Sequence, residues 1–335
     1  MNWHGLDVIL ELRRKLCIMA FVKQYKCSKY RFDGDRLDVF LTGQFKNLSR
    51  SKVQKLIKDG EISVNGNVEK SGYVLLSRDT ITVNDFKKEK QNLIAEKTDV
   101  PVLYEDNDVF VVNKPYGMIV HPVEGANIMT GTLVNAVLEK IKKDQFDGLR
   151  PGIVHRIDKD TSGLLVIAKN RKAYDDMVSQ FKNRTVKKYY LALVYGILKY
   201  PEGIIESPIK RAVVNRKKMC VSSENSGKNA VSVYKTLRTF NVRNGKHRCS
   251  LLEIQIKTGR THQIRVHMSS IGHPVIGDVV YGNRKINNYF EHKFNLHRQF
   301  LHAYKVNFIS PATKKEVSIE EGLPVDLENV ITQIS

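Results

Sequence analysis

The chain has 335 residues, with 55 Lys and Arg against 35 Asp and Glu, which gives a formal net charge of +20. A hydrophobic fraction of 41% excludes a mainly disordered chain, and no apolar run approaches the roughly 20 residues that span a bilayer. The basic excess favours a polyanionic partner, since charge balance reports on partners and solubility rather than on fold. Four cysteines without a C-x-x-C pair form no disulfide framework, so a reduced, cytoplasmic setting fits best.

The N-terminal region divides near residue 31. Residues 1–30 show no ordered pattern and are interpreted as an extension, for which disorder is one interpretation and Met19 an alternative translation start. Residues 31–85 have the pattern of a small separate unit, in which two helices precede a hairpin whose strands include Ile62–Val64 and a returning strand at Val68.

The second helix of this unit begins after Ser49 and turns a basic face outward, which holds Arg50, Lys52 and Lys55. A basic helix face is most often only solvated. Here, however, it stands between another helix and Asn65-Gly66, which is typical of a type I′ hairpin turn. This order resembles an S4-type RNA-binding domain, and the resemblance implies that the three basic residues contact RNA.

Residues 86–99 are charged and weakly apolar, and we interpret them as a linker. Beyond residue 100, strand-like runs alternate with a few helices as far as about residue 330. This pattern predicts an α+β unit built on one large, mixed and mainly antiparallel sheet with a central cleft. Two of its helices have residues predicted to face the core, namely Tyr174, Met177, Val178 and Phe181 in the first, capped by Asn170, and Ile264, Met268 and Ile271 in the second.

Three segments carry residue types that suit a reaction site. In the first, a polar loop with His155, Arg156 and Asp158 leads directly into an apolar strand, an arrangement in which catalytic groups are often held. In the second, strand alternation places Tyr190 on a face with Ala192. Composition alone favours the plainer interpretations, a turn or ion-pair residue for Asp158 and core packing for Tyr190.

The third segment is a strand that ends at Lys257-Thr-Gly259 and is followed by a helix. His262 and Arg265 lie three residues apart near the start of this helix, on a shared side that suits an anion. His262 and His267 are five apart and fit no H-E-x-x-H zinc pattern. The sequence also has no phosphate-binding loop of the G-x-x-x-x-G-K-[ST] or G-x-G-x-x-G kind.

Half of the net charge lies between residues 207 and 250, where 11 basic residues face one acid, Glu224. The densest part is the triplet Arg216, Lys217 and Lys218. We interpret this stretch as a basic hairpin or loop that lies over a nucleic-acid backbone.

In this order the segments resemble the RluA-type pseudouridine synthases. The resemblance covers about residues 31–327 and rests on Gly152-Ile-Val-His-Arg-Ile-Asp-Lys-Asp-Thr-Ser-Gly163, Lys187-Lys-Tyr-Tyr190 and Gly259-Arg-Thr-His-Gln-Ile-Arg-Val-His-Met268, with Val111-Val-Asn-Lys-Pro-Tyr-Gly117 upstream and Arg298-Gln-Phe-Leu-His-Ala303 downstream. With an S4-like unit in front, the chain is most similar to the RluD subgroup, which modifies large-subunit ribosomal RNA. Ile157 stands where Leu is usual, a change that conserves volume.

The resemblance implies specific roles. Asp158 matches the essential aspartate that acts on the sugar, Arg265 the arginine that pairs with it, and Tyr190 the tyrosine that stacks on the target base and assists loss of the C5 proton. His155 and Arg156 are implied aids to base flipping and phosphate binding. The reaction involves no redox change or hydrolysis, so neither a cofactor nor a metal is expected.

The implied partner is large-subunit ribosomal RNA or a pre-ribosomal particle. We expect the protein to be a cytoplasmic monomer that needs neither a membrane nor an obligate protein partner. Three alternatives remain at this point. The same chemistry could act on transfer RNA or another RNA, the fold could serve a non-catalytic assembly factor, or the chain could be a phosphate-handling hydrolase. The missing phosphate loop and the absence of a recognisable Ser-His-Asp arrangement count against the hydrolase.

Overall fold

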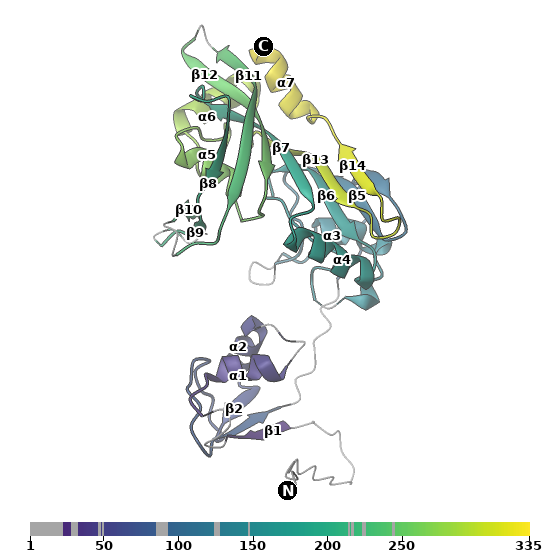
Figure 1. Ribbon diagram of the computed structural model, residues 1–335, viewed down its shortest axis with the longest axis vertical. Helices are drawn as coiled ribbons and strands as arrows, with labels where there is room; N and C mark the ends of the chain where they lie inside the picture. Colours follow the sequence, from purple (N-terminus) through teal and green to yellow (C-terminus); the bar gives the residue numbers. More distant parts are fainter. Residues whose placement is uncertain are drawn as a thin grey trace. The chain divides into compact units, whose positions relative to one another are not determined.

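The structure is a computed structural model that describes residues 23–27, 33–45, 48, 50–84, 93–123, 128–146, 148–213, 215, 218–222, 226–242 and 245–335. The chain divides between Lys90 and Gln91 into two units, each with its own core (Figure 1). Within these residues, no helix has the length and apolar character needed to cross a bilayer.

The N-terminal unit packs two helices on a small antiparallel sheet. The helices are α1 (Leu37–Gln44) and α2 (Arg50–Lys58), and the strands, in sheet order, are β1 (Lys23–Lys26), β3 (Thr80–Val83) and β2 (Ile62–Val64). The apolar positions spaced along both helices are buried in one cluster with the strands, as the helical spacing predicts.

Two features of this unit differ from the prediction. The strand β1 and the buried Cys27 lie before the expected boundary at residue 31, so the unit extends into the segment interpreted as an extension. Asn65 and Gly66 do adopt the positive φ angles of 52° and 81° that a type I′ turn requires, but Val68 is 57% exposed and lies in no strand. The long-range partner of β2 is instead β3, because the chain makes a further loop before it returns.

The expected linker is partly built into the C-terminal unit. Leu93 is buried in the main core of that unit, and the carboxylate of Glu96 accepts hydrogen bonds from the backbone N–H of Gly131 at 2.9 and 3.0 Å. Of residues 86–99, therefore, the part from 93 onward is fixed to the C-terminal unit.

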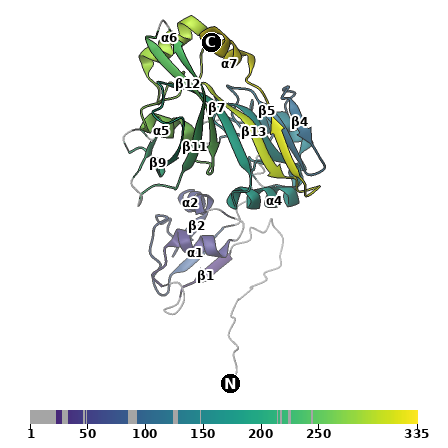
Figure 2. The same cartoon turned by 45° about the horizontal axis from the view of Figure 1, so that its top comes forward.

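The C-terminal unit is built on a nine-stranded sheet. Its order is β4-β5-β6-β13-β7-β12-β11-β8, with β14 beside β13. The strands are β4 (Val102–Glu105), β5 (Val109–Lys114), β6 (Ser162–Ala168), β7 (Lys187–Tyr195), β8 (Glu202–Glu206), β11 (Val231–Val242), β12 (His247–Ile256), β13 (Leu301–Ile309) and β14 (Glu316–Glu320). All of these neighbours are antiparallel except β6 and β13, which confirms the predicted mixed, mainly antiparallel sheet (Figures 1 and 2).

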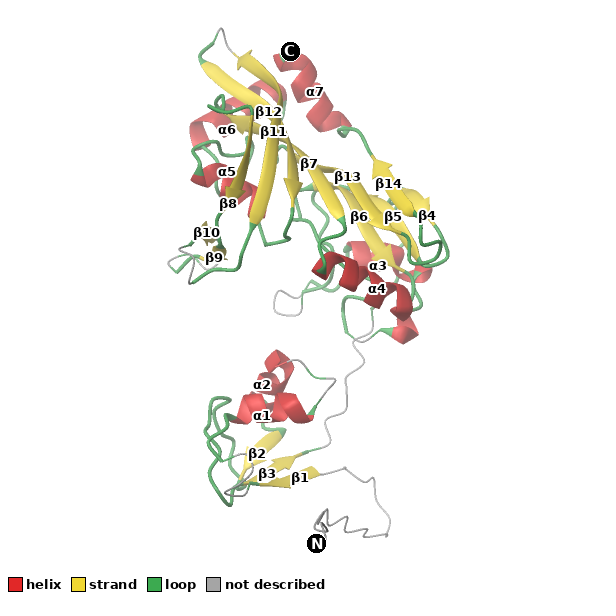
Figure 3. Cartoon of the chain, viewed as in Figure 1, coloured by secondary structure: helices red, strands yellow, loops and turns green. Residues whose placement is uncertain are grey.

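Helices cover both faces of this sheet (Figure 3). They are α3 (Leu133–Val137), α4 (Arg171–Lys182), α5 (Gln263–Ser270), α6 (Arg284–Phe294) and α7 (Val325–Ile334); short 3-10 turns span Leu138–Lys140 and Lys143–Gln145, and a separate ribbon pairs β9 (Ile209–Arg211) with β10 (Met219–Val221). Because α3 and α4 pack on opposite faces of β5 and β6, every residue of β6 is buried. Such double cover explains why β6 reads as a continuous apolar run.

The helix patterns predicted most of the inward residues, with two exceptions. Asn170 caps α4 as expected, because its side-chain oxygen accepts from the N–H of Ala173 at 2.9 Å. Met177, Ile264 and Met268 are buried, and Tyr174 and Phe181 pack against a core. Val178 and Ile271, however, are 38% and 40% exposed, and Ile271 lies just beyond the last residue of α5, Ser270.

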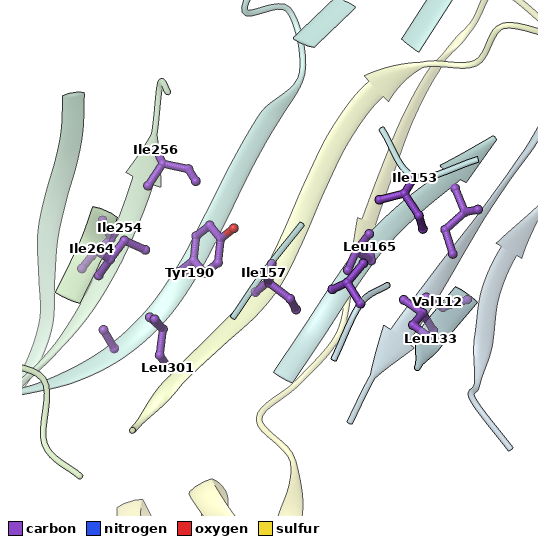
Figure 4. Packing of buried hydrophobic residues seen from close by; sticks show 14 of the residues in the cluster. Val112, Leu133, Ile153, Ile157, Leu165, Tyr190, Ile254, Ile256, Ile264 and Leu301 are labelled. Atoms are coloured by element: carbon purple, nitrogen blue, oxygen red, sulfur yellow. The ribbon is translucent and has the colours of Figure 1, made fainter. Parts of the chain in front are cut away.

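The main core of this unit extends to the loop that carries Asp158 and to Tyr190. Figure 4 follows it from Val112 and Leu133, past Ile157, to Tyr190 and Ile264. Ile157 is 6% exposed, so the residue directly before Asp158 is held in the core. The polar loop is therefore fixed by packing as well as by hydrogen bonds.

Candidate active site

The loop that carries Asp158 is held in place by hydrogen bonds from the buried Lys114. The Lys114 ammonium donates hydrogen bonds to the carbonyl oxygens of Pro115 at 2.6 Å, Met118 at 2.9 Å and Lys159 at 3.1 Å. Burial lowers the pKa of Lys114 to about 7. Through these bonds one side chain ties the segment after β5 to the residue that follows Asp158.

A glycine brings this loop into the sheet. Gly163 has a φ of +116°, and a Cβ at this position would lie 2.3 Å from the carbonyl oxygen of Ala303 on β13. The two pairs that join β6 to β13 are Ser162 with His302 and Gly163 with Ala303, and the Ser162 Oγ lies 2.9 Å from the His302 Nδ1. Only glycine permits this close approach of the two backbones.

Arg265, the third residue of α5, joins two carboxylates. Its Nη1 donates to Asp158 Oδ2 at 2.9 Å, while Nε and Nη2 donate to the two oxygens of Asp278 at 2.6 and 2.9 Å. The structure thus brings Asp158 and Arg265 together as predicted. Burial alone would lower the pKa of Arg265, but its hydrogen bonds and charge interactions with both carboxylates outweigh burial and raise it.

Asp278 is the site residue that the sequence did not indicate. Its carboxylate is completely buried and also accepts from the backbone N–H groups of Val280 and Tyr281 at 2.8 and 3.0 Å. The bidentate pair fixes the plane of the guanidinium and so aims Nη1 at Asp158. In the sequence, Gly277-Asp278 before Tyr281-Gly282 signals only a turn, because the pattern does not show that the carboxylate points inward.

Tyr190 lies in the cavity wall on β7 and is 5% exposed. Burial, with a contribution from the charge of Asp158, raises the pKa of its phenol above the ordinary value. The phenol is therefore neutral at neutral pH and offers a ring face and an O–H group, not a phenolate.

Asp158, Tyr190 and Arg265 line one cavity of about 280 Å³. Its walls come from the Asp158 loop, the turn between α4 and β7, and the segment from Lys257 to Arg265. Its charged side chains are Arg156, Asp158, Arg184, Lys188, Lys257, Arg260 and Arg265. Six of these seven are cations, so the cavity is suited to part of a polyanion.

His262 lines the cavity near Arg265, and Tyr281 contacts both residues from outside the lining. His262 has a left-handed φ of 57° before α5, and its Nδ1 lies 2.9 Å from the Tyr281 hydroxyl. Burial lowers the pKa of His262, which favours the neutral ring. The Arg265 guanidinium lies 5.2 Å from the centre of the Tyr281 ring. His262 and Arg265 thus share a side of the site, as their spacing predicted.

His155 and Arg156 lie in the same wall but differ in character. The His155 Nε2 accepts from the N–H of Val166 at 2.9 Å, and its ring lies 4.8 Å from that of Phe181. Burial lowers the pKa of His155 to about 3, so the ring is neutral and leaves only Nδ1 for a ligand. Arg156 is exposed, with Nη1 3.5 Å from the Nε2 of His121. Their contacts with RNA stay predictions.

The other predicted RNA contacts belong to other elements of the chain. On α2, Lys52 and Lys55 are exposed, whereas Arg50 is half-exposed and pairs with the buried Asp38 at 3.0 Å. Lys218 directly precedes β10, where its carbonyl accepts from the N–H of Ala212 at 2.9 Å. Arg216 and Lys217 lie outside the described residues. Among the residues that the structure describes, no three His, Cys, Asp or Glu side chains are grouped so as to hold a metal ion.

Comparisons with known proteins give the class. The family model for RNA pseudouridylate synthase matches residues 108–270, and that for the S4 domain matches residues 35–81. An uncharacterized RNA pseudouridine synthase of Bacillus subtilis is 42% identical over 302 residues, which cover 90% of this chain and 94% of that protein. Ribosomal large subunit pseudouridine synthase D of Zymomonas mobilis is 39% identical over 306 residues, which cover 88% and 92%.

A solved human structure, RNA pseudouridylate synthase domain containing 1, has 25% identity and a TM-score of 0.52 over 72% of this chain and 96% of that one. The chain therefore belongs to the RNA pseudouridine synthases, enzymes that isomerise uridine in RNA to pseudouridine. Within them it is of the RluA and RluD type, with an S4 domain in front of the catalytic unit.

Proposed function

We propose that this enzyme isomerises specific uridines in large-subunit ribosomal RNA, with Asp158 as its catalytic carboxylate. The observation that carries the assignment of Asp158 is the Arg265 guanidinium, which is fixed by Asp278 and donates to Asp158 at 2.9 Å beside Tyr190 in one cavity. A buried cation with a fixed orientation places permanent positive charge next to the carboxylate and holds it in position.

The reaction breaks the C1′–N1 bond, turns the uracil and joins C5 to C1′. The proton on C5 is released and N1 gains one, so the balance needs no oxidant, reductant or water. Asp158 acts at the sugar, either by attack on C1′ or by assisting formation of a glycal, and Arg265 is the residue that positions it. Tyr190 stacks on the base. Because its phenol is neutral, removal of the C5 proton requires that the Tyr190 hydroxyl relay the proton to a further acceptor.

A target uridine inside a duplex cannot reach Asp158, so the nucleotide is flipped into the cavity. The cavity volume of about 280 Å³ suits one nucleotide rather than a helix. His155 and Arg156, in the wall, assist this flipping and phosphate binding, with Nδ1 as the available atom of His155.

Large-subunit ribosomal RNA, free or in a pre-ribosomal particle, is supported as the target by relatives whose names specify it, at 35% to 39% identity. The S4 domain offers Arg50, Lys52 and Lys55, and the β9–β10 region offers Arg216, Lys217 and Lys218, as contacts with its backbone. We propose that the enzyme acts as a monomer in the cytoplasm.

The test is tritium release from large-subunit ribosomal RNA labelled at C5 of uridine, with and without EDTA. We expect release by the wild-type enzyme in both conditions, and a loss of at least about 1,000-fold in Asp158→Asn, because the amide keeps the shape but not the charge. The binding of RNA by Asp158→Asn should stay close to that of the wild type.

Asp160→Asn is the matched control, since Asp160 lies in the same loop but does not line the cavity. It should keep turnover within about tenfold. Multiple turnover by Asp158→Asn would refute the catalytic assignment. Release from transfer RNA but not from ribosomal RNA would refute the target and leave the isomerase intact.

A further inference from the structure

Lys188 is a cavity cation that the site described above does not use. It lies two residues before Tyr190 on β7, and the two share the cavity face because side chains alternate along a strand. Its ammonium lies 5.2 Å from the centre of the Phe181 ring. Lys187, the neighbour on the opposite face, is exposed and does not line the cavity.

Among the described residues that line the cavity, Lys188 stands with five other cations and a single carboxylate, that of Asp158. That carboxylate is already bound to Arg265, and no ion pair joins Lys188 to a carboxylate in the part of the chain that the structure describes. Burial lowers the pKa of Lys188 to about 8, which reflects the cost of keeping a charge in this place. A partly buried cation that is not bound to a carboxylate is stabilised when an anion binds.

A second cation stands in the same wall at an unusual backbone position. Arg184 has a φ of +60° and follows the last turn of α4, where the N–H groups of Arg184 and Thr185 bond back to the carbonyls of Phe181 and Gln180. This is the Schellman arrangement, in which the left-handed position is usually glycine. An arginine there is strained, and strained residues cluster at functional sites.

We propose that Lys188 and Arg184 form a phosphate subsite that binds a phosphodiester next to the flipped uridine. This inference rests on the proposed function, because it places the backbone of the same RNA whose base stacks on Tyr190. Phe181 helps to position the Lys188 side chain, since its ring contacts both the Lys188 ammonium and the His155 ring. The β7 strand then fixes the base and its phosphate together, with Lys188 and Tyr190 two residues apart.

Binding is measured first, in the Asp158→Asn background, as the Kd for a labelled ribosomal RNA stem-loop over a range of KCl concentrations. Lys188→Met keeps the aliphatic contact with Phe181 and removes only the charge. We expect it to raise Kd about tenfold and to lower the log–log salt slope by about 0.7, the value for one phosphate contact on a single strand. Lys188→Arg should restore both, and the control Lys187→Met should change neither.

Arg184→Gly separates strain from binding. Glycine accepts the φ of +60°, so the thermal midpoint should not fall, while Kd should rise severalfold. In the otherwise wild-type enzyme, Lys188→Met should raise KM more than it lowers kcat.

An unchanged Kd and salt slope in Lys188→Met would show that the ammonium only packs on Phe181 and would overturn the subsite. An unchanged Kd in Arg184→Gly would overturn its share in it. Failure of the proposed function gives a different result, namely no tritium release from ribosomal RNA by the wild-type enzyme whatever the Kd values of the variants.

Discussion

Each unit of this enzyme contains a buried aspartate bound by arginine, but the two networks differ in whether the arginine is exposed or buried. In the S4 domain, the fully buried Asp38 accepts from Arg36, Arg50 and Gln54, and both arginines remain about half exposed. In the catalytic unit, the fully buried Asp278 holds an arginine that is itself 5% exposed.

The difference lies in what each aspartate positions. Asp38 gathers two arginines that stay at the surface, where water already stabilises their charge. Asp278 orients one arginine toward a second carboxylate, so its effect is passed to Asp158 inside the cavity. The same kind of ion pair therefore holds two half-exposed arginines in one unit and a buried arginine against a second carboxylate in the other.

Among changes to the two aspartate–arginine networks, the largest effect is expected from Asp278→Asn. The substitution leaves buried Arg265 without one of its two carboxylates, which should cost about 3 kcal/mol in the free energy of unfolding of the catalytic unit. Turnover should also fall by about 100-fold or more, since the guanidinium is no longer aimed at Asp158. Urea denaturation and tritium release measure the two losses. Wild-type turnover in this variant would show that Asp278 does not act on Asp158.

A smaller loss, in activity rather than stability, is expected from Arg265→Lys. An ammonium cannot make the two-pronged bond to Asp278 and reach Asp158 as well, so kcat should fall by about 100-fold. The matched variant Arg50→Lys, at the half-exposed arginine of the other network, should leave kcat unchanged. If Arg265→Lys also kept its kcat, the two networks would not differ in the way proposed.

Asp38 should make the S4 domain sensitive to acid. Burial alone would raise the pKa of Asp38, but hydrogen bonds from Arg50, Arg36 and Gln54 outweigh it, and the pKa is lowered well below the ordinary value. A lowered pKa gives stability that is present above about pH 4, the pKa in the unfolded chain, and is lost as the pH falls further.

Amide hydrogen exchange on the full chain between pH 4.5 and pH 2.5 tests this. Opening of α1 and α2 should become easier as the pH falls, beyond the change in intrinsic exchange. Asp38→Asn should already show the easier opening at pH 7, by about 2 kcal/mol, with a weaker dependence on pH. Equal pH dependence in the two proteins would assign the effect to other groups.

The smallest effect is expected at the exposed face of α2. Replacing Lys52 and Lys55 with Ser should lower the log–log salt slope of RNA binding by at most about two units, since each phosphate contact contributes somewhat less than one. The saturating single-turnover rate should not change, because both residues lie in the other unit from the cavity. A fall in that rate with an unchanged salt slope would contradict an RNA-binding role for this face.

The sequence predicted the parts of the fold that have a strong local pattern. Helix α2 was visible from its apolar spacing, and the pairing of Asp158 with Arg265 followed from the resemblance to a family. Strand β1, by contrast, is the four residues Lys-Gln-Tyr-Lys, whose polar composition gives no strand signal. It forms because β3 supplies a free edge, which is a tertiary effect.

Asp278 escaped prediction for a similar reason. Its role depends on a turn that brings its carboxylate to Arg265 of α5, and a sequence pattern records the turn without its direction. The backbone strain at Arg184 could not be predicted either, because it consists of a positive φ angle that only the structure shows. Val178 shows that a helical repeat locates the apolar face of a helix but not how much of that face the neighbouring elements cover. Ile271, which follows the last residue of α5, shows that the repeat does not mark where a helix ends.

The close approach at Gly163 has a mechanical consequence. Asp158 lies in the loop that leads into β6, whereas Tyr190 lies on β7 and Arg265 on α5, which follows β12. Strands β4, β5 and β6 are joined to the rest of the sheet by only two residue pairs between β6 and β13, Ser162 with His302 and Gly163 with Ala303. A methyl group at residue 163 would force β6 and β13 apart. Asp158 would then shift relative to Tyr190 and Arg265, although residue 163 lines no part of the cavity.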